Sequence, residues 1–199
     1  MQQGADIFRI VLPTRGSQVG FQNSLQGLGA CKFKQNQKCG HFEACIVCKV
    51  MYGMDVSWLN KADQRKLDAF QASCLRKIAG IEHSYVSRVS NKTVRETLGC
   101  HPLSHKLLER QLLFLGRIAQ AESDNILRQA VFKDNSIELL SVQGPRRKGR
   151  PRKHWINELY GISKRIAGST HSLANLWAND HASRGAWEKA VKEYCSQLG

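Results

Sequence analysis

The sequence predicts a mainly α-helical protein. Apolar residues recur at helical spacing through most of the chain, and no segment shows the alternating apolar and polar pattern of a half-buried strand. Gly and Pro interrupt the helical pattern in one strongly basic stretch. These observations predict a small helical bundle and a C-terminal helical group, joined by an extended basic linker, with the first about 40 residues irregular.

This pattern divides the chain into four expected regions. They are a poorly defined N-terminal segment (1–48), a helical domain (49–140), a basic Gly/Pro linker (141–153) and a C-terminal helical group (154–199).

Each expected helix has a local reason. In the most regular one, 60–79, apolar residues share one face, Asn60 is a candidate N-cap and Gly80 a natural stop. The stripe on that face is Leu67, Phe70, Cys74, Leu75 and Ile78. Similar arguments predict helices over 91–98, 105–121, 125–133, 154–168 and 185–198, with a helical turn within 172–183. The apolar segment 42–54 fits a helix or a strand.

The charge of the chain is strongly positive. Thirty Lys and Arg stand against sixteen Asp and Glu, a net charge of +14, and residues 60–199 hold twenty-four of the cations and thirteen of the anions. Such a field favours a polyanionic partner, DNA and/or RNA. No apolar run reaches membrane-spanning length, and the N-terminus does not resemble a secretory signal, so we expect an intracellular protein with reduced cysteines and no membrane partner.

A group of early Cys and His residues has partial zinc spacing. Cys45-x2-Cys48 could be completed by Cys39 and His41. The segment lacks the turn residues of a zinc knuckle, and on a helix both thiols of the pair would share a face and could pack in a core. We therefore expect no metal and no cofactor, and keep these four as weak candidates.

The segment "GPRRKGRPRKHW" is the most basic of the chain. Its candidate nucleic-acid-binding residues are Arg146, Arg147, Lys148, Gly149, Arg150, Arg152 and Lys153. A Gly-Arg-Pro core flanked by cations suits the minor groove of A·T-rich DNA and resembles an AT-hook. A nuclear-import signal and a solvated linker explain the same residues.

The order of short motifs around this segment resembles the region after the polymerase core in LINE-type (non-LTR) retrotransposon reverse transcriptases. The resemblance covers about residues 49–190. The matching residues are Tyr52, Gly53, Trp58, Phe70, Gln71, Cys74, Leu75, Arg76, Ile78, Gly80, Ile81, Ser90, Asn91, Leu115, Gly116, Gly149, Arg150, Pro151, Trp155, Arg184 and Trp187. Arg117 stands where the family has His.

The resemblance implies a thumb and post-thumb region, with residues 49–140 thumb-like. The chain lacks the Tyr-x-Asp-Asp motif and paired carboxylates for two metals, so it implies no polymerase activity. It implies a nuclear, non-catalytic fragment that contacts template-primer or target DNA, with the remainder of a reverse transcriptase polyprotein as a further partner. Arg76 and Lys77 are expected to contact the nucleic-acid backbone, and Trp155 and Trp187 to lie in the core.

Two alternatives stay open. One is a degenerate retroelement remnant, or an interaction scaffold, without a selected function. The other is a metal-dependent nuclease that uses Asp180 and His181.

Overall fold

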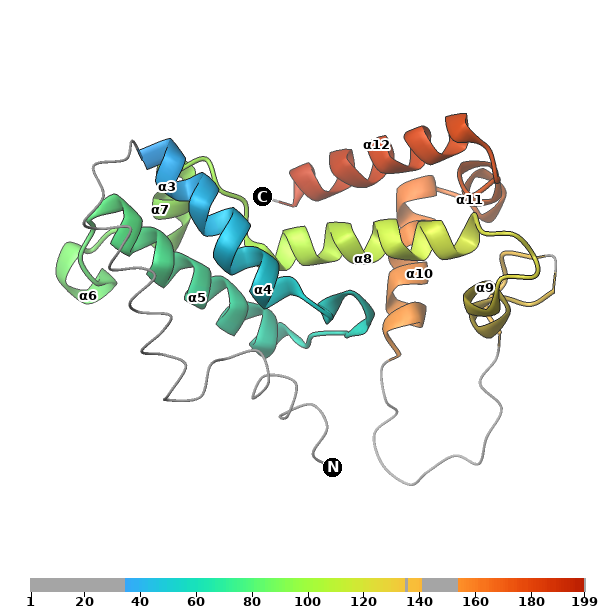
Figure 1. Ribbon diagram of the computed structural model, residues 1–199, viewed down its shortest axis with the longest axis horizontal. Helices are drawn as coiled ribbons and strands as arrows, with labels where there is room; N and C mark the ends of the chain where they lie inside the picture. The colour runs from blue at the N-terminus through green and yellow to red at the C-terminus, as the bar shows by residue number, and fades with distance from the viewer. Residues whose placement is uncertain (1–34, 135, 141–153, 199) are drawn as a thin grey trace, which may run out of the picture. The chain divides into compact units, whose positions relative to one another are not determined.

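The computed structural model describes residues 35–134, 136–140 and 154–198 (Figure 1). These residues are mainly helical, which confirms the predicted fold class; their β structure is an isolated bridge between Phe132 and Leu139. The first described helix starts at Gln35. The last residues of the segment expected to be irregular, 35–40, are therefore helical. The expected linker, 141–153, and residues 1–34 lie outside the described residues.

The chain forms two compact units whose limits differ from the predicted domains. Of the described residues, 35–52 and 61–104 form the N-terminal unit, and 53–60, 105–134, 136–140 and 154–198 form the C-terminal unit. The predicted domain 49–140 is thus divided at residue 104, and its second part belongs with the predicted C-terminal helical group. Periodicity shows that a helix has an apolar face, but it does not name the helix that covers that face.

The N-terminal unit is built on α5 (Lys61–Ala79), against which two other helices pack. One is α3 (Gln35–Phe42), which continues through the π-helical turn Glu43–Val47 into α4 (Cys48–Met51). The other is α7 (Asn91–Thr97), which follows the single turn α6 (Ser84–Ser87). The segment that fitted a helix or a strand is therefore helical.

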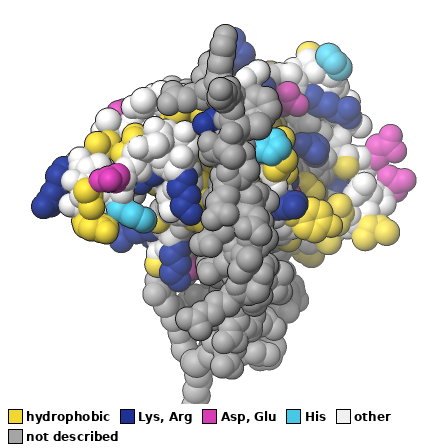
Figure 2. Space-filling view, turned by 60° about the vertical axis from the view of Figure 1, so that its left-hand side comes forward, with side chains coloured by type: hydrophobic (Ala, Val, Ile, Leu, Met, Phe, Trp, Pro, Cys, Tyr) yellow, Lys and Arg dark blue, Asp and Glu magenta, His cyan; other side chains and the backbone are white. Residues whose placement is uncertain are grey.

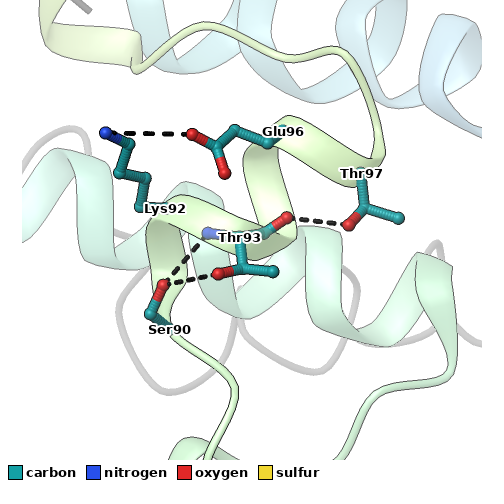
Figure 3. A network of polar contacts seen from close by, with 5 residues as sticks. All are labelled: Ser90, Lys92, Thr93, Glu96 and Thr97. Atoms are coloured by element: carbon teal, nitrogen blue, oxygen red, sulfur yellow. Dashed lines mark hydrogen bonds and ion pairs between the residues drawn. The ribbon is translucent and has the colours of Figure 1, made fainter.

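Local signals set the ends of α5 and α7. Gly80 has φ +69°, a left-handed conformation that costs glycine little, and α5 ends at the residue before it. The Ser90 hydroxyl accepts a hydrogen bond from the Thr93 amide at 3.0 Å and caps α7. Figure 3 shows this cap together with the Lys92–Glu96 ion pair of 3.9 Å along the same helix.

Two polar side chains of α5 fix the start of α8 (Leu103–Ala119). Gln71 is fully buried; its amide nitrogen donates to the His101 carbonyl at 2.8 Å, and its oxygen accepts from the Leu103 amide at 3.1 Å. The Asp68 carboxylate accepts from the amide and the hydroxyl of Ser104 at 2.9 and 2.7 Å. These acceptors satisfy first-turn amides of α8, so the helix begins two residues before the predicted residue 105.

The C-terminal unit packs the remaining helices around α8. They are the 3-10 turn η2 (Met54–Val56), α9 (Ile126–Val131), α10 (Trp155–Ala167), α11 (Thr170–Leu176) and α12 (His181–Gln197). Their shared core includes Leu112, Leu115, Ile118, Phe132, Leu159, Leu173, Trp177, Trp187 and Val191. The predicted helices are present here, and α12 begins four residues before the predicted residue 185 because Asp180 caps it.

Trp187 of α12 packs directly on Gly116 of α8. The indole is 2% exposed, and its Nε1–H donates to the Leu112 carbonyl at 3.3 Å. A Cβ at Gly116 would overlap the indole ring. Trp155 is half-buried and stacks on Phe114 with ring centroids 6.2 Å apart. Trp187 is thus a core residue, as expected, whereas Trp155 packs at the edge of the core.

We predict that Gly116→Ala destabilises the protein by roughly 1–3 kcal/mol, because the new methyl group must displace the buried indole. Gly161→Ala is the matched control, since a Cβ there meets no atom within 4 Å and alanine favours a helix. Urea unfolding measures both. Equal free energies of unfolding for the two variants would contradict the close packing of Trp187 on Gly116.

Candidate nucleic-acid interface

Arg76 of α5, one of the two residues expected to contact a nucleic-acid backbone, does not face solvent. Its side chain is buried, 6% exposed. Nη1 donates to the Glu82 carbonyl at 3.1 Å and the Ser87 hydroxyl at 3.3 Å; Nη2 donates to the Val89 carbonyl at 2.5 Å and the Asn91 side-chain oxygen at 3.0 Å. The prediction that Arg76 contacts a nucleic-acid backbone is therefore wrong. Its guanidinium instead holds the segment between α5 and α7.

Lys77, the neighbouring candidate, is exposed in the last turn of α5. It lines a cavity of about 230 Å³ within the N-terminal unit, together with Ser73, His83 and Ser84. The buried Arg76 guanidinium also borders this cavity. An exposed ammonium group beside a hollow can meet a phosphate without losing a protein partner, so Lys77 remains a candidate phosphate contact.

Among the described residues, only those of the N-terminal unit carry a net positive charge. Its described residues, 35–52 and 61–104, hold ten Lys and Arg against five Asp and Glu. The described residues of the C-terminal unit hold ten against ten and are neutral. The candidate run Arg146–Lys153 lies outside the described residues; its segment, 141–153, adds six cations and no anion. The excess over residues 60–199 thus comes mainly from that segment and from 61–104.

Figure 2 shows how the cationic groups are distributed on one face. Lys and Arg side chains lie there among exposed hydrophobic and histidine side chains, and acidic side chains are fewer.

The weak zinc candidates do not form a metal site in the part of the chain that the structure describes. No group of three or more Cys, His, Asp or Glu side chains comes together there. Cys45 Sγ lies 3.6 Å from His41 Nε2, and burial raises the pKa of the Cys39 thiol. Cys45 and Cys48 are exposed. The alternative that the helix places this pair in a core is therefore wrong.

The buried face of this helical segment explains the exposed thiols. Phe42, Ile46 and Val50 are spaced four residues apart and are buried. Cys45 and Cys48 do share a face, as their spacing predicts, but it is the face opposite this stripe.

Asp180, proposed for the nuclease alternative, has a structural role. Its carboxylate accepts from the Ser183 amide at 2.6 Å and the Ser183 hydroxyl at 2.9 Å, and so caps α12. These hydrogen bonds lower the pKa of the Asp180 carboxyl group. The residue next to it, His181, is exposed in the first turn of α12.

Two aromatic residues that sequence reasoning missed lie on the surface beside the Arg76 contacts. Tyr85 of α6 is 73% exposed, and its ring stacks on that of His83, with centroids 5.9 Å apart and planes at 17°. A signal was present in the sequence: an aromatic residue in a short segment between Gly80 and Ser90, without an apolar stripe that would bury it.

Comparison of the chain with protein-family models, curated proteins and solved structures finds no match. Across the described ranges, no helix combines the length and the apolar character that spanning a membrane would take.

We predict that Arg76→Ala lowers the free energy of unfolding by roughly 1–3 kcal/mol, because the substitution removes a buried side chain and leaves partly buried acceptors without their donor. Lys77→Ala is the control, since this neighbour is exposed, and should change stability by about 0.5 kcal/mol at most. Urea unfolding compares the two. An Arg76→Ala variant as stable as Lys77→Ala would contradict the structural role of Arg76.

We also predict that a thiol reagent labels Cys45 and Cys48 quickly in the folded protein and labels Cys74 and Cys195 slowly. The first two are exposed, whereas burial raises the pKa of both Cys74 and Cys195 to about 11 and so reduces their thiolate form near neutral pH. Mass spectrometry of the labelled peptides measures the rates. In urea the four rates should become similar, which separates folding from intrinsic reactivity.

Proposed function

We propose that this chain is a non-catalytic nucleic-acid-binding part of a LINE-type retrotransposon reverse transcriptase. The observation that carries the proposal is the distribution of charge. The described residues of the C-terminal unit carry no net charge and those of the N-terminal unit carry +5, whereas the thirteen-residue segment 141–153, which joins residues 140 and 154 of the C-terminal unit along the chain, adds six cations and no anion.

This distribution favours a specific polyanion over general solubility. A chain that uses charge only to stay soluble has no need to concentrate it, whereas phosphate binding gains from adjacent cations that release counterions together. The Gly-Arg-Pro core of the segment adds the chemistry of minor-groove binding, in which arginine side chains enter a narrow groove. DNA or RNA is therefore the partner that fits best.

The retroelement origin is supported by what the motif residues do in the fold. Gln71 and Arg76 belong to one motif and Asn91 to another; Gln71 bonds to the start of α8, and Arg76 bonds to Asn91 at the start of α7. Gly116 and Trp187 belong to two others and pack on each other. Two pairs of motif residues that are distant in sequence, Arg76 with Asn91 and Gly116 with Trp187, thus contact each other, which is expected if the motifs belong to one fold.

This function requires no catalytic residue in the chain. The region would grip template-primer or target DNA while the polymerase core of the same polyprotein carries out synthesis, and it would act in the nucleus. The degenerate-remnant alternative predicts a different physical behaviour, a broad and non-cooperative thermal melt.

We predict that the double variant Arg150→Ala/Arg152→Ala binds DNA more weakly and with a smaller salt dependence. Loss of two phosphate contacts would make the slope of log affinity against log salt shallower by about 2, at roughly 0.9 per contact. Fluorescence anisotropy over a salt series measures both quantities.

The matched control is Lys189→Ala/Lys192→Ala, which removes the same charge from α12 of the C-terminal unit. It should leave the slope close to that of the wild type. Equal slopes for both double variants would show that the basic segment does not contact nucleic acid.

A further inference from the structure

The segment between α5 and α7 presents an aromatic pair to solvent. Tyr85 and Val86 of α6 are 73% and 52% exposed, and the exposed His83 ring lies nearly parallel to the Tyr85 ring, with 17° between the planes. Stacked rings usually lie in cores, where their surface is removed from water. A surface pair in this arrangement leaves ring faces available to a further planar group.

The backbone that carries the pair is held in one conformation. The Arg76 guanidinium binds the segment at four acceptors, on both sides of α6. The Ser87 hydroxyl lies 3.1 Å from the carbonyl oxygens of Glu82 and His83. The pair is therefore pre-organised, and the loop would lose little conformational entropy when a ligand binds it.

Arg88 completes this loop in an unusual conformation. Its φ is +56°, the left-handed region that non-glycine residues rarely adopt, and among the described residues it is the one non-glycine residue with positive φ. Its amide donates to the Ser84 carbonyl at 3.0 Å and so closes α6. The side chain is exposed. The left-handed conformation ends α6, as it commonly does at helix C-termini, and it leaves the Arg88 side chain exposed as a cation beside the aromatic pair.

The surroundings of the pair are cationic. Lys77 and Arg88 are exposed here, whereas Arg76 is buried, Lys92 pairs with Glu96 at 3.9 Å, and Glu82 is the one acidic residue of 76–95. Lys77 and His83 line the same cavity of about 230 Å³, below the roughly 300–1,000 Å³ of drug-sized pockets and suited to a small group such as a phosphate. An apolar protein partner would meet this charge unfavourably.

We propose that the His83–Tyr85 pair is a stacking platform for an unpaired base of single-stranded nucleic acid, with Lys77 and Arg88 contacting the adjacent phosphates. Ring faces and cations are the two features that single-strand binding combines. In a duplex the base faces are already stacked on one another, so duplex DNA cannot use the platform. The inference rests on the proposed function and names the strand form that this unit would recognise.

The test measures binding of the full chain to three labelled probes at one fixed salt concentration. They are a single-stranded RNA and a single-stranded DNA of about 12 nucleotides, within the site size of such surfaces, and a blunt DNA duplex. Tyr85→Ala should weaken binding of at least one single strand about tenfold, the loss expected for one stacked base, and leave duplex affinity unchanged. Which strand is affected distinguishes RNA from DNA.

Two further variants separate stacking from charge. Tyr85→Trp keeps a large ring and should retain single-strand affinity. Arg88→Gly suits the left-handed backbone, so the variant should fold normally. It should make the slope of log affinity against log salt for single strands shallower by about 0.7, the contribution of one phosphate contact.

The outcomes separate the inference from the proposed function. If the wild type binds nucleic acid but Tyr85→Ala binds both single strands as tightly, the platform is excluded and the proposed function stands. If the wild type binds none of the three probes, both are excluded. A cooperative thermal melt of each variant shows that affinity changes do not arise from unfolding.

Discussion

The buried guanidinium of Arg76 is the interaction on which the N-terminal unit most depends. It lies at the end of α5 and donates to acceptors on both sides of α6, including Asn91 at the start of α7. None of these four acceptors is a carboxylate, so the charge is stabilised by carbonyl, hydroxyl and amide dipoles. Only a side chain with several donors in one plane can bind so many acceptors at once, so lysine could not replace it.

Because Arg76 is buried, it does not add to the exposed positive charge of the N-terminal unit. The cation nearest the candidate interface is occupied inside the fold, and the exposed cations around it, such as Lys77 and Arg88, remain for a ligand. Arg76 contributes indirectly, because it fixes the loop that presents His83 and Tyr85. One short stretch of sequence thus holds both a buried cation with a structural role, Arg76, and exposed cations, Lys77 and Arg88.

The C-terminal unit is organised by shape instead of charge. Trp187 fits against α8 because Gly116 has no side chain, and the surrounding aromatic rings of Phe132 and Trp177 meet edge to face. Its described residues carry no net charge.

The sequence by itself determined the helical class and most helix positions, because helical spacing and residues such as Gly80 and Ser90 act locally. It did not determine that Gln71 is buried and Phe70 is only half-buried, that Arg76 faces inward, or that Cys45 and Cys48 face outward. Those outcomes depend on which other helix or loop of the chain covers each helix face. Only the tertiary structure decided them, because burial and hydrogen bonding are set by residues distant in sequence, such as His101 for Gln71.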